Sequence, residues 1–129
     1  MKKLTGIILV GVGLFISSAL YAQSIDGVVK GLKNGNAAQI TENAGDSFSL
    51  TLLDSSNNYK KEQALTLLKS FFGKNAVKSF DLKHKGNSPR GQYAIGTLTT
   101  SGGSYRVNIF MKKDEGKEVI KELRIQLIE

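Results

Sequence analysis

Three side chains in this sequence have the chemistry to serve a ligand or a reaction: His84, Tyr93 and Tyr105. His84 is the only histidine, and its imidazole could act as a general base or hold a ligand in a pocket. The two tyrosines could add hydroxyl groups, although aromatic residues at strand spacing are more often packing residues. His84 could equally be a core or rim histidine with a structural hydrogen bond. We predict a ligand pocket at these three residues and no catalytic residue.

Metal and cofactor chemistry is not indicated. One histidine, no cysteine and no carboxylate pair on one strand face fall short of a usual metal ligand set. The phosphate-binding glycine loop, the nucleophile elbow and the zinc-protease helix motif are also missing. We therefore expect no metal and no cofactor. We expect a non-enzymatic module that binds a small apolar or amphipathic ligand, or that assembles with itself or an envelope partner. The alternative is a small isomerase or hydratase that uses His84 with Tyr93 or Tyr105.

The elements that must position these side chains begin with helices. Apolar residues at helical spacing predict helices over Ser24–Lys33, Ala37–Asn43 and Lys60–Phe72, the last ended by Gly73. Leu68 and Phe72 are the predicted centre of the core. Alternation of apolar and polar residues predicts strands, and polar stretches predict loops; the strands are Ser47–Leu53 and Val77–Lys85, and the loops are Asp54–Asn58 and Gly86–Gly91. On Val77–Lys85, His84 is expected to share a face with Phe80 and Leu82.

The strands Gln92–Thr100 and Tyr105–Lys112 are predicted to form a hairpin. Gly102-Gly103 suits a two-residue turn, which would place Leu98 opposite Val107. One face then looks like a core; it carries Ala94, Gly96, Leu98, Tyr105, Val107, Ile109 and Met111. A second hairpin, closed by a three-residue loop at Asp114-Glu115-Gly116, would pair Met111 with Val119 and Val107 with Leu123. It would add four more residues to this face: Val119, Leu123, Ile125 and Leu127.

The opposite, outer face of these strands is polar apart from one apolar patch. The predicted registers bring Ile95, Phe110 and Ile120 together, with Tyr93 at the edge. A contiguous apolar patch opposite the core is typical of an association surface. These three residues are the predicted interface of a homodimer; the alternative is that they are ordinary exposed or covered hydrophobic residues.

The order of elements predicts an α+β fold, in which N-terminal helices pack on the concave face of a curved antiparallel sheet. The sequence resembles the nuclear transport factor 2-like superfamily, and more narrowly a family of small exported bacterial proteins labelled only as a domain of unknown function. The matching residues are Gly35-Asn36, Tyr59–Ala64, Phe71-Phe72, His84–Gly86, Tyr93–Leu98 and Tyr105–Val107. The resemblance implies a cone-shaped fold that commonly pairs through its outer sheet face, and it implies no catalytic residue.

The N-terminus predicts an export signal. Lys2 and Lys3 precede an uncharged apolar run that ends in small residues, so residues 1–22 are expected to be a signal peptide, with cleavage after Ala22 or after Ala19. A membrane anchor is the alternative, but the run is shorter than the ~20 residues that a span needs. Residues 23–129 suffice for one domain without disulfides, and we expect it in the periplasm or secreted.

The charge of the chain does not indicate nucleic-acid binding. The formal net charge is +7, two units of it from the signal segment, and the basic residues are scattered without a run of five. We expect no nucleic-acid partner and no membrane span in the mature chain. A small-molecule ligand and a second copy of the chain are the expected partners.

Overall fold

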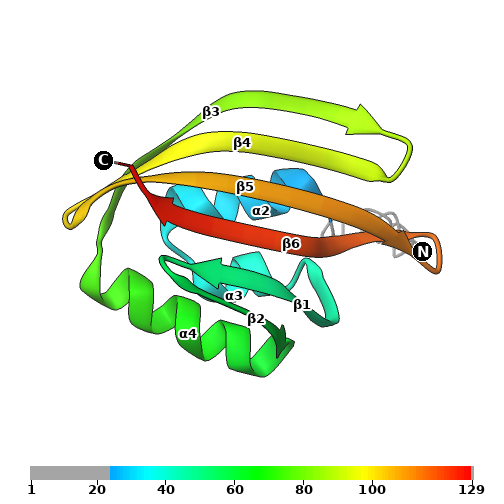
Figure 1. Cartoon of the computed structure of the whole chain (residues 1–129), viewed down its shortest axis with the longest axis horizontal. Coiled ribbons are helices and arrows are strands. Elements are labelled where there is room, and N and C mark those ends of the chain that lie inside the picture. Colours follow the sequence, from blue (N-terminus) through cyan, green and yellow to red (C-terminus); the bar gives the residue numbers. More distant parts are fainter. Residues whose placement is uncertain (1–23, 129) are drawn as a thin grey trace, which may run out of the picture.

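The computed structural model describes residues 24–128, and the predicted signal segment lies outside them (Figure 1). Its elements in chain order are helices α2 (Ile25–Asn34) and α3 (Ala37–Thr41), strands β1 (Ala44–Leu52) and β2 (Ser55–Lys60), helix α4 (Lys61–Lys74), and strands β3 (Val77–Ser88), β4 (Gly91–Thr100), β5 (Gly103–Asp114) and β6 (Lys117–Leu127). The strands form one curved sheet in the order β2-β1-β6-β5-β4-β3. Neighbouring strands are antiparallel except β1 and β6, which run parallel, so the sheet is mixed rather than purely antiparallel as predicted. Between residues 24 and 128, no helix is long and apolar enough to cross a membrane.

The first two helices lie where the sequence predicts, although α3 ends at Thr41, two residues before the predicted Asn43. Ser24 caps α2 by accepting a hydrogen bond from the backbone N of Gly27 at 3.2 Å. Gly35, with φ of 62°, ends the helix in the left-handed region. Asn36 then caps α3 through its side-chain oxygen, which accepts from the backbone N of Gln39 at 3.0 Å. These local signals fix the sharp bend between the two helices.

Helix α4 differs from the prediction at its C-terminus. It continues through Gly73 to Lys74, and Asn75 closes it by donating from Nδ2 to the backbone oxygen of Phe71 at 2.9 Å. Leu68 is fully buried, as predicted, but Phe71 rather than Phe72 is the buried aromatic residue of the pair. Phe72 packs against the edge of the core. The prediction of Phe72 as a central core residue is therefore wrong; both neighbouring phenylalanines border the wide apolar stripe of the helix, and the spacing alone does not separate them.

Strand β2 lies where the sequence predicts a polar loop, Asp54–Asn58. It pairs with β1 through contacts such as Phe48 opposite Tyr59 and Leu50 opposite Asn57. β2 is an edge strand of the sheet, and five of its six residues are exposed. This edge strand shows no alternation of apolar and polar residues, so its sequence pattern predicts a loop.

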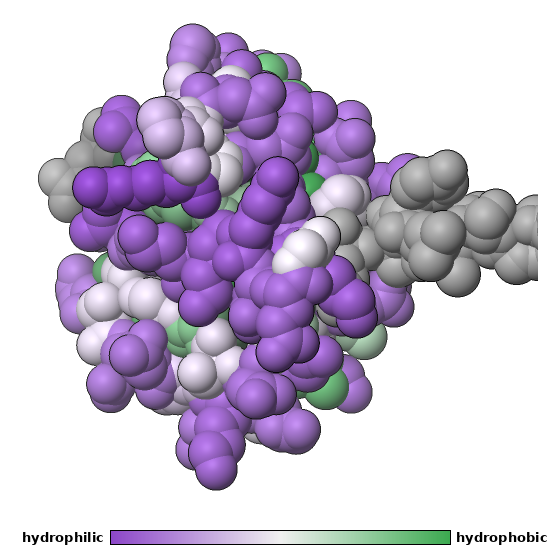
Figure 2. Space-filling view, turned by 90° about the vertical axis from the view of Figure 1, so that its right-hand side faces the viewer, coloured by the Kyte–Doolittle hydropathy of each residue, from purple (hydrophilic) through white to green (hydrophobic). Residues whose placement is uncertain are grey.

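The core lies between the helices and one face of the sheet. The odd-numbered side chains Tyr105 to Met111 of β5 are all buried, which confirms the predicted division of this strand into two faces. The helices cover that face, and the opposite face, the outer face, is turned away from them (Figure 1). At the end of the molecule that carries the β3–β4 and β5–β6 turns, the surface is mainly hydrophilic (Figure 2).

The β4–β5 hairpin keeps the predicted faces but not the predicted register. Its loop is Ser101-Gly102 rather than Gly102-Gly103, so Leu98 lies opposite Tyr105 instead of Val107. The Thr100 hydroxyl stabilises this turn, because it donates to the oxygen of Gly103 and accepts from the backbone N of Gly102. The change moves each partner by two residues, which leaves every side chain on its predicted face.

The β5–β6 hairpin departs further from the prediction. Its loop has two residues, Glu115 and Gly116, both with positive φ, and Met111 lies opposite Ile120 instead of Val119. A bulge follows, because Phe110 lies opposite Glu122 and leaves Lys121 as the extra residue. Ile120 therefore points into the core with no exposed surface, and the outer-face position predicted for it is wrong. Leu123 and Ile125 are buried as predicted, whereas Leu127 is 55% exposed.

Candidate functional site

Tyr105 does not belong to a ligand pocket in this structure. It lies on the helix-covered face of β5, is 5% exposed, and stacks edge-on against Phe71 with ring centroids 5.2 Å apart. Its hydroxyl donates to Oδ1 of Asn75 at 3.1 Å, the same side chain that closes α4. Tyr105 is thus a core residue that joins the C-terminus of α4 to the sheet.

His84 and Tyr93 lie together on the outer face. A bulge in β3 between Leu82 and His84 makes Lys83 the extra residue and turns His84 away from the face of Phe80. Nε2 of His84 lies 3.2 Å from the hydroxyl of Tyr93, and the two ring centroids are 5.7 Å apart. His84 is exposed, so the histidine expected beside Phe80 is a surface residue. Of the three predicted pocket residues, only these two meet, and Tyr105 lies on the other side of the sheet.

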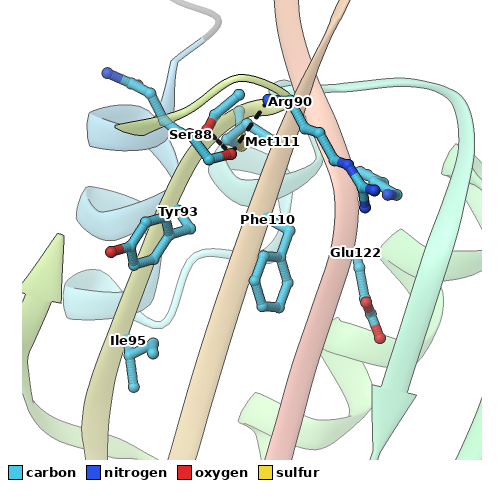
Figure 3. Close-up of a pocket in the computed structure, with 10 residues that line it drawn as sticks. Ser88, Arg90, Tyr93, Ile95, Phe110, Met111 and Glu122 are labelled. Carbon is cyan, nitrogen blue, oxygen red and sulfur yellow. Dashed lines mark hydrogen bonds between the residues drawn. The ribbon is translucent and has the colours of Figure 1, made fainter. Parts of the chain in front are cut away.

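The outer face carries a pocket of about 550 Å³ that is lined by Tyr93 but not by His84 (Figure 3). Its floor is apolar and consists of Tyr93 and Ile95 on β4 with Phe110 on β5; we call these residues the apolar floor. Tyr93, Phe110 and Glu122 lie opposite one another on adjacent strands and so form one row across the sheet. In Figure 3 their side chains project from the same face, away from the helices. The pocket volume lies within the range of roughly 300–1,000 Å³ typical of small-molecule sites.

The β3–β4 turn forms the rim of this pocket and holds Arg90 over the sheet. The hydroxyl of Ser88 donates to the oxygen of Gly91 at 3.0 Å and accepts from the backbone N of Arg90 at 3.2 Å. Gly91 has φ of 143° and lies against the backbone of Met111, where a Cβ would lie 2.4 Å from the carbonyl oxygen. Figure 3 shows the Arg90 side chain extending from this turn across β5 toward β6.

A second hollow of about 700 Å³ adjoins the pocket at the turn end of the sheet. The two share Ser88, Arg90, Gly91, Gln92 and Lys121, and the second is also lined by Lys112, Lys113 and Glu118. We call this second hollow the basic groove. It carries four cations and one carboxylate, whereas the floor of the first pocket is apolar. Together they resemble the two ends of one elongated site.

Acid–base chemistry finds little support beyond the His84–Tyr93 contact. Within residues 24–128, no group of three or more histidine, cysteine or acidic side chains is placed to hold a metal ion. Glu122 is the carboxylate beside the apolar floor, and its Oε2 lies 3.4 Å from Nε of Arg124. The arrangement can bind and orient a small molecule through apolar contact and charge.

Sequence reasoning found the apolar floor but missed the cations beside it. Tyr93, Ile95 and Phe110 follow from strand alternation, which the structure preserves. Arg90 was placed in an undefined loop, and Lys121 reaches the site only because of the bulge next to Ile120. The one available signal was the Ser88-Pro89 sequence, which favours a tight turn close to Arg90.

The fold defines a protein class: an α+β cone of the nuclear transport factor 2-like type. The chain is similar to a nuclear transport factor 2-like protein of unknown function from Cytophaga hutchinsonii, with a TM-score of 0.59 and 10% identity over 81% of this chain and 86% of that one. It is also similar to a putative polyketide cyclase from Sinorhizobium meliloti, with a TM-score of 0.62 and 8% identity over 79% and 92% of the two chains. At these identities the likeness shows the fold alone.

Within this class, the family model described as domain of unknown function (DUF4783) matches residues 25–126, and the chain belongs to this family. It is 32% identical to a DUF4783 family protein from Bacteroides uniformis, with a TM-score of 0.77 over 81% of this chain and 96% of that one. A DUF4783 family protein from Bacteroides ovatus is also 32% identical, with a TM-score of 0.78 and coverage of 84% and 98%. The family implied by the sequence is thereby confirmed, and so is the expected nuclear transport factor 2-like fold. Comparison with the curated proteins gives no match.

Proposed function

We propose that this protein is a non-enzymatic binding module that takes a small amphipathic ligand into the outer-face pocket. The observation that carries the proposal is the apolar floor, three half-buried apolar side chains beside a hollow on an otherwise polar sheet face. Desolvating such a floor favours binding of an alkyl or ring group, at roughly 25 cal/mol per Å² of apolar surface buried. Polar side chains at the rim would hold the polar end of the same molecule.

The test uses 1-octanol, a neutral amphiphile, titrated into ¹⁵N-labelled protein of residues 23–129. Binding in the pocket should shift the amide signals of Tyr93, Ile95 and Phe110 and leave those of the helices α2 and α3 unchanged. The Phe110→Glu variant places a carboxylate on the floor and should abolish these shifts. The rest of its amide spectrum should remain that of the folded protein. Equal shifts in the variant, or shifts confined to the core residues, would refute an outer-face site.

Self-assembly is a second candidate function, because the apolar floor would also suit a second copy of the chain. A homodimer through the outer face would bury Ile95 and Phe110 at its centre, without the predicted contribution of Ile120. Light scattering should then give twice the monomer mass for the unmodified chain and the monomer mass for Phe110→Glu. An unmodified chain that is monomeric at millimolar concentration would remove this candidate and leave the ligand site intact.

The proposal includes export, because a lysine pair and an apolar run precede the residues that fold into the domain. The site would then meet ligands of the periplasm or the surroundings of the cell. Expression of the full chain in a bacterial host should yield a processed protein in the periplasmic or culture fraction, beginning at Gln23 or at Leu20. A full-length protein that stays in the cytoplasm would contradict export.

A further inference from the structure

We infer that the ligand of the outer-face pocket carries an anionic head group, so the site takes single-chain amphiphilic anions such as alkyl carboxylates or alkyl phosphates. This inference rests on the proposed binding function and adds the chemical class of the ligand. Its basis is the union of two hollows, one with an apolar floor and one with a basic lining, at the β3–β4 turn.

The mouth of the pocket is lined by basic side chains. Arg90 and Lys121 line both hollows, and Lys112 and Lys113 extend the basic lining away from the apolar floor. None of the four takes part in the ion pairs formed within residues 24–128, which join Lys83 to Asp81, Lys85 to Asp26 and Arg124 to Glu122. Their positive charge is therefore available to a ligand.

Two acidic side chains, Glu118 and Glu122, line the same hollows as these cations. Glu118 faces Lys113 across the β5–β6 ladder, and Glu122 already contacts Arg124. In the lining of the two hollows, four cations therefore stand against these two carboxylates. A cluster of like charges on a rim raises the local concentration of an anion and disfavours a cation of the same size.

The backbone of the β3–β4 turn holds Arg90 in place. The Ser88 hydroxyl bonds to the backbone of both Arg90 and Gly91, and Gly91 contacts the Met111 backbone too closely for any larger residue. The Cα of Arg90 is thus fixed above the sheet, and its guanidinium reaches across β5 (Figure 3). A planar guanidinium recognises carboxylate and phosphate oxygens in pairs.

The test compares three amphiphiles with the same chain and different heads: octanoate, 1-octanol and octyltrimethylammonium. Dissociation constants come from amide shifts of Ile95 and Phe110 at low salt. We expect octanoate to bind at least 10-fold more tightly than 1-octanol, and octyltrimethylammonium to bind more weakly than 1-octanol. Equal affinity for all three would overturn the anionic head while leaving the proposed pocket standing. Absence of binding by all three would overturn the proposed function with it.

A pair of double variants separates specific from general charge effects. Arg90→Gln with Lys121→Gln should lower octanoate affinity until it lies within about 2-fold of the affinity that the same variant has for 1-octanol. Lys30→Gln with Lys78→Gln removes the same net charge from exposed positions on α2 and β3, and should change octanoate affinity less than 2-fold. An equal loss in both variants would refute a local anion site. A membrane surface is the competing source of anionic head groups. If the protein sedimented with phosphatidylglycerol vesicles but octanoate caused no amide shift at Ile95, the protein would bind a membrane surface and not a free amphiphile, and the inference would be refuted.

Discussion

The ring of Tyr93 lies against Gly86, the residue directly opposite it in the β3–β4 ladder. A Cβ at Gly86 would lie 2.7 Å from the Tyr93 hydroxyl oxygen and 2.8 Å from Cζ. The glycine therefore makes room for the aromatic ring to lie across the neighbouring strand, where its hydroxyl meets His84 at 3.2 Å. The Tyr93 ring, which forms one edge of the apolar floor, can take this position because Gly86 has no side chain.

We predict that Gly86→Ala moves the Tyr93 ring without unfolding the protein. The clashing atoms are the far end of a flexible side chain, so the ring can turn away, and the cost in stability should stay below about 1 kcal/mol. The contact between His84 and Tyr93 would be lost, and 1-octanol affinity should fall several-fold. Chemical denaturation and the amide titration measure the two effects separately. An unchanged Tyr93 environment in the variant would contradict this account of the floor.

Two other glycines should respond to alanine in opposite directions. Gly91→Ala forces a side chain against the Met111 carbonyl at φ of 143°, and we expect a loss of more than about 2 kcal/mol in the free energy of unfolding. Gly73→Ala lies inside α4 with nothing within 4 Å of the new methyl group. It should raise the unfolding free energy by about 0.5–1 kcal/mol. Urea denaturation of both variants checks the pair, and equal effects would refute the contrast.

The local signals of the sequence specify much of this fold. Ser24, Gly35 and Asn36 act where capping rules place them, and the alternation along β5 assigns each residue to the correct face. Both are determined by neighbours within a few residues. A two-residue change in the β4–β5 register does no harm to this assignment, because side chains alternate with a period of two.

The site was less predictable, because it depends on two bulges. Lys83 in β3 and Lys121 in β6 are each one residue too many for their ladders, and each interrupts the alternation of faces along its strand. The first bulge carries His84 to the outer face, and the second carries Ile120 into the core. A bulge is favoured by packing between strands that are far apart in sequence, so no local pattern of charge or hydrophobicity announces it.

The aromatic pair of α4 offers a test of core position. Phe71 is 6% exposed and contacts both Phe72 and Tyr105, whereas Phe72 lies at the edge of the core. Phe71→Ala should cost about 3–5 kcal/mol, comparable to Leu68→Ala at about 2–5 kcal/mol, and Phe72→Ala should cost clearly less than either. Thermal and urea unfolding give the order. A larger loss at Phe72 would mean that α4 is rotated relative to this structure.

Tyr105→Phe separates a structural tyrosine from a ligand-binding one. The change removes the hydrogen bond to Asn75 Oδ1, which then lacks a donor, and should lower the unfolding free energy by about 1–2 kcal/mol. Affinity for octanoate should stay within 2-fold of the unmodified protein, because Tyr105 lies on the opposite face of the sheet from the pocket. Tyr93→Phe is the matched control for loss of a tyrosine hydroxyl on the outer face. A large loss of octanoate affinity in Tyr105→Phe would contradict this account and indicate that Tyr105 contacts the ligand.

Glutamate at Phe110 and at Ile120 should give opposite outcomes, because the bulge places these two residues on different faces. Ile120 is 0% exposed and Phe110 is half-buried on the outer face. Ile120→Glu buries an unpaired charge, which costs several kcal/mol against a total stability of about 5–15 kcal/mol, so this variant should be unfolded or insoluble. Phe110→Glu should remain folded by circular dichroism and lose ligand affinity and any self-association. If Ile120→Glu were instead folded and had lost self-association, the result would support the predicted register without a bulge, in which Ile120 lies on the outer face.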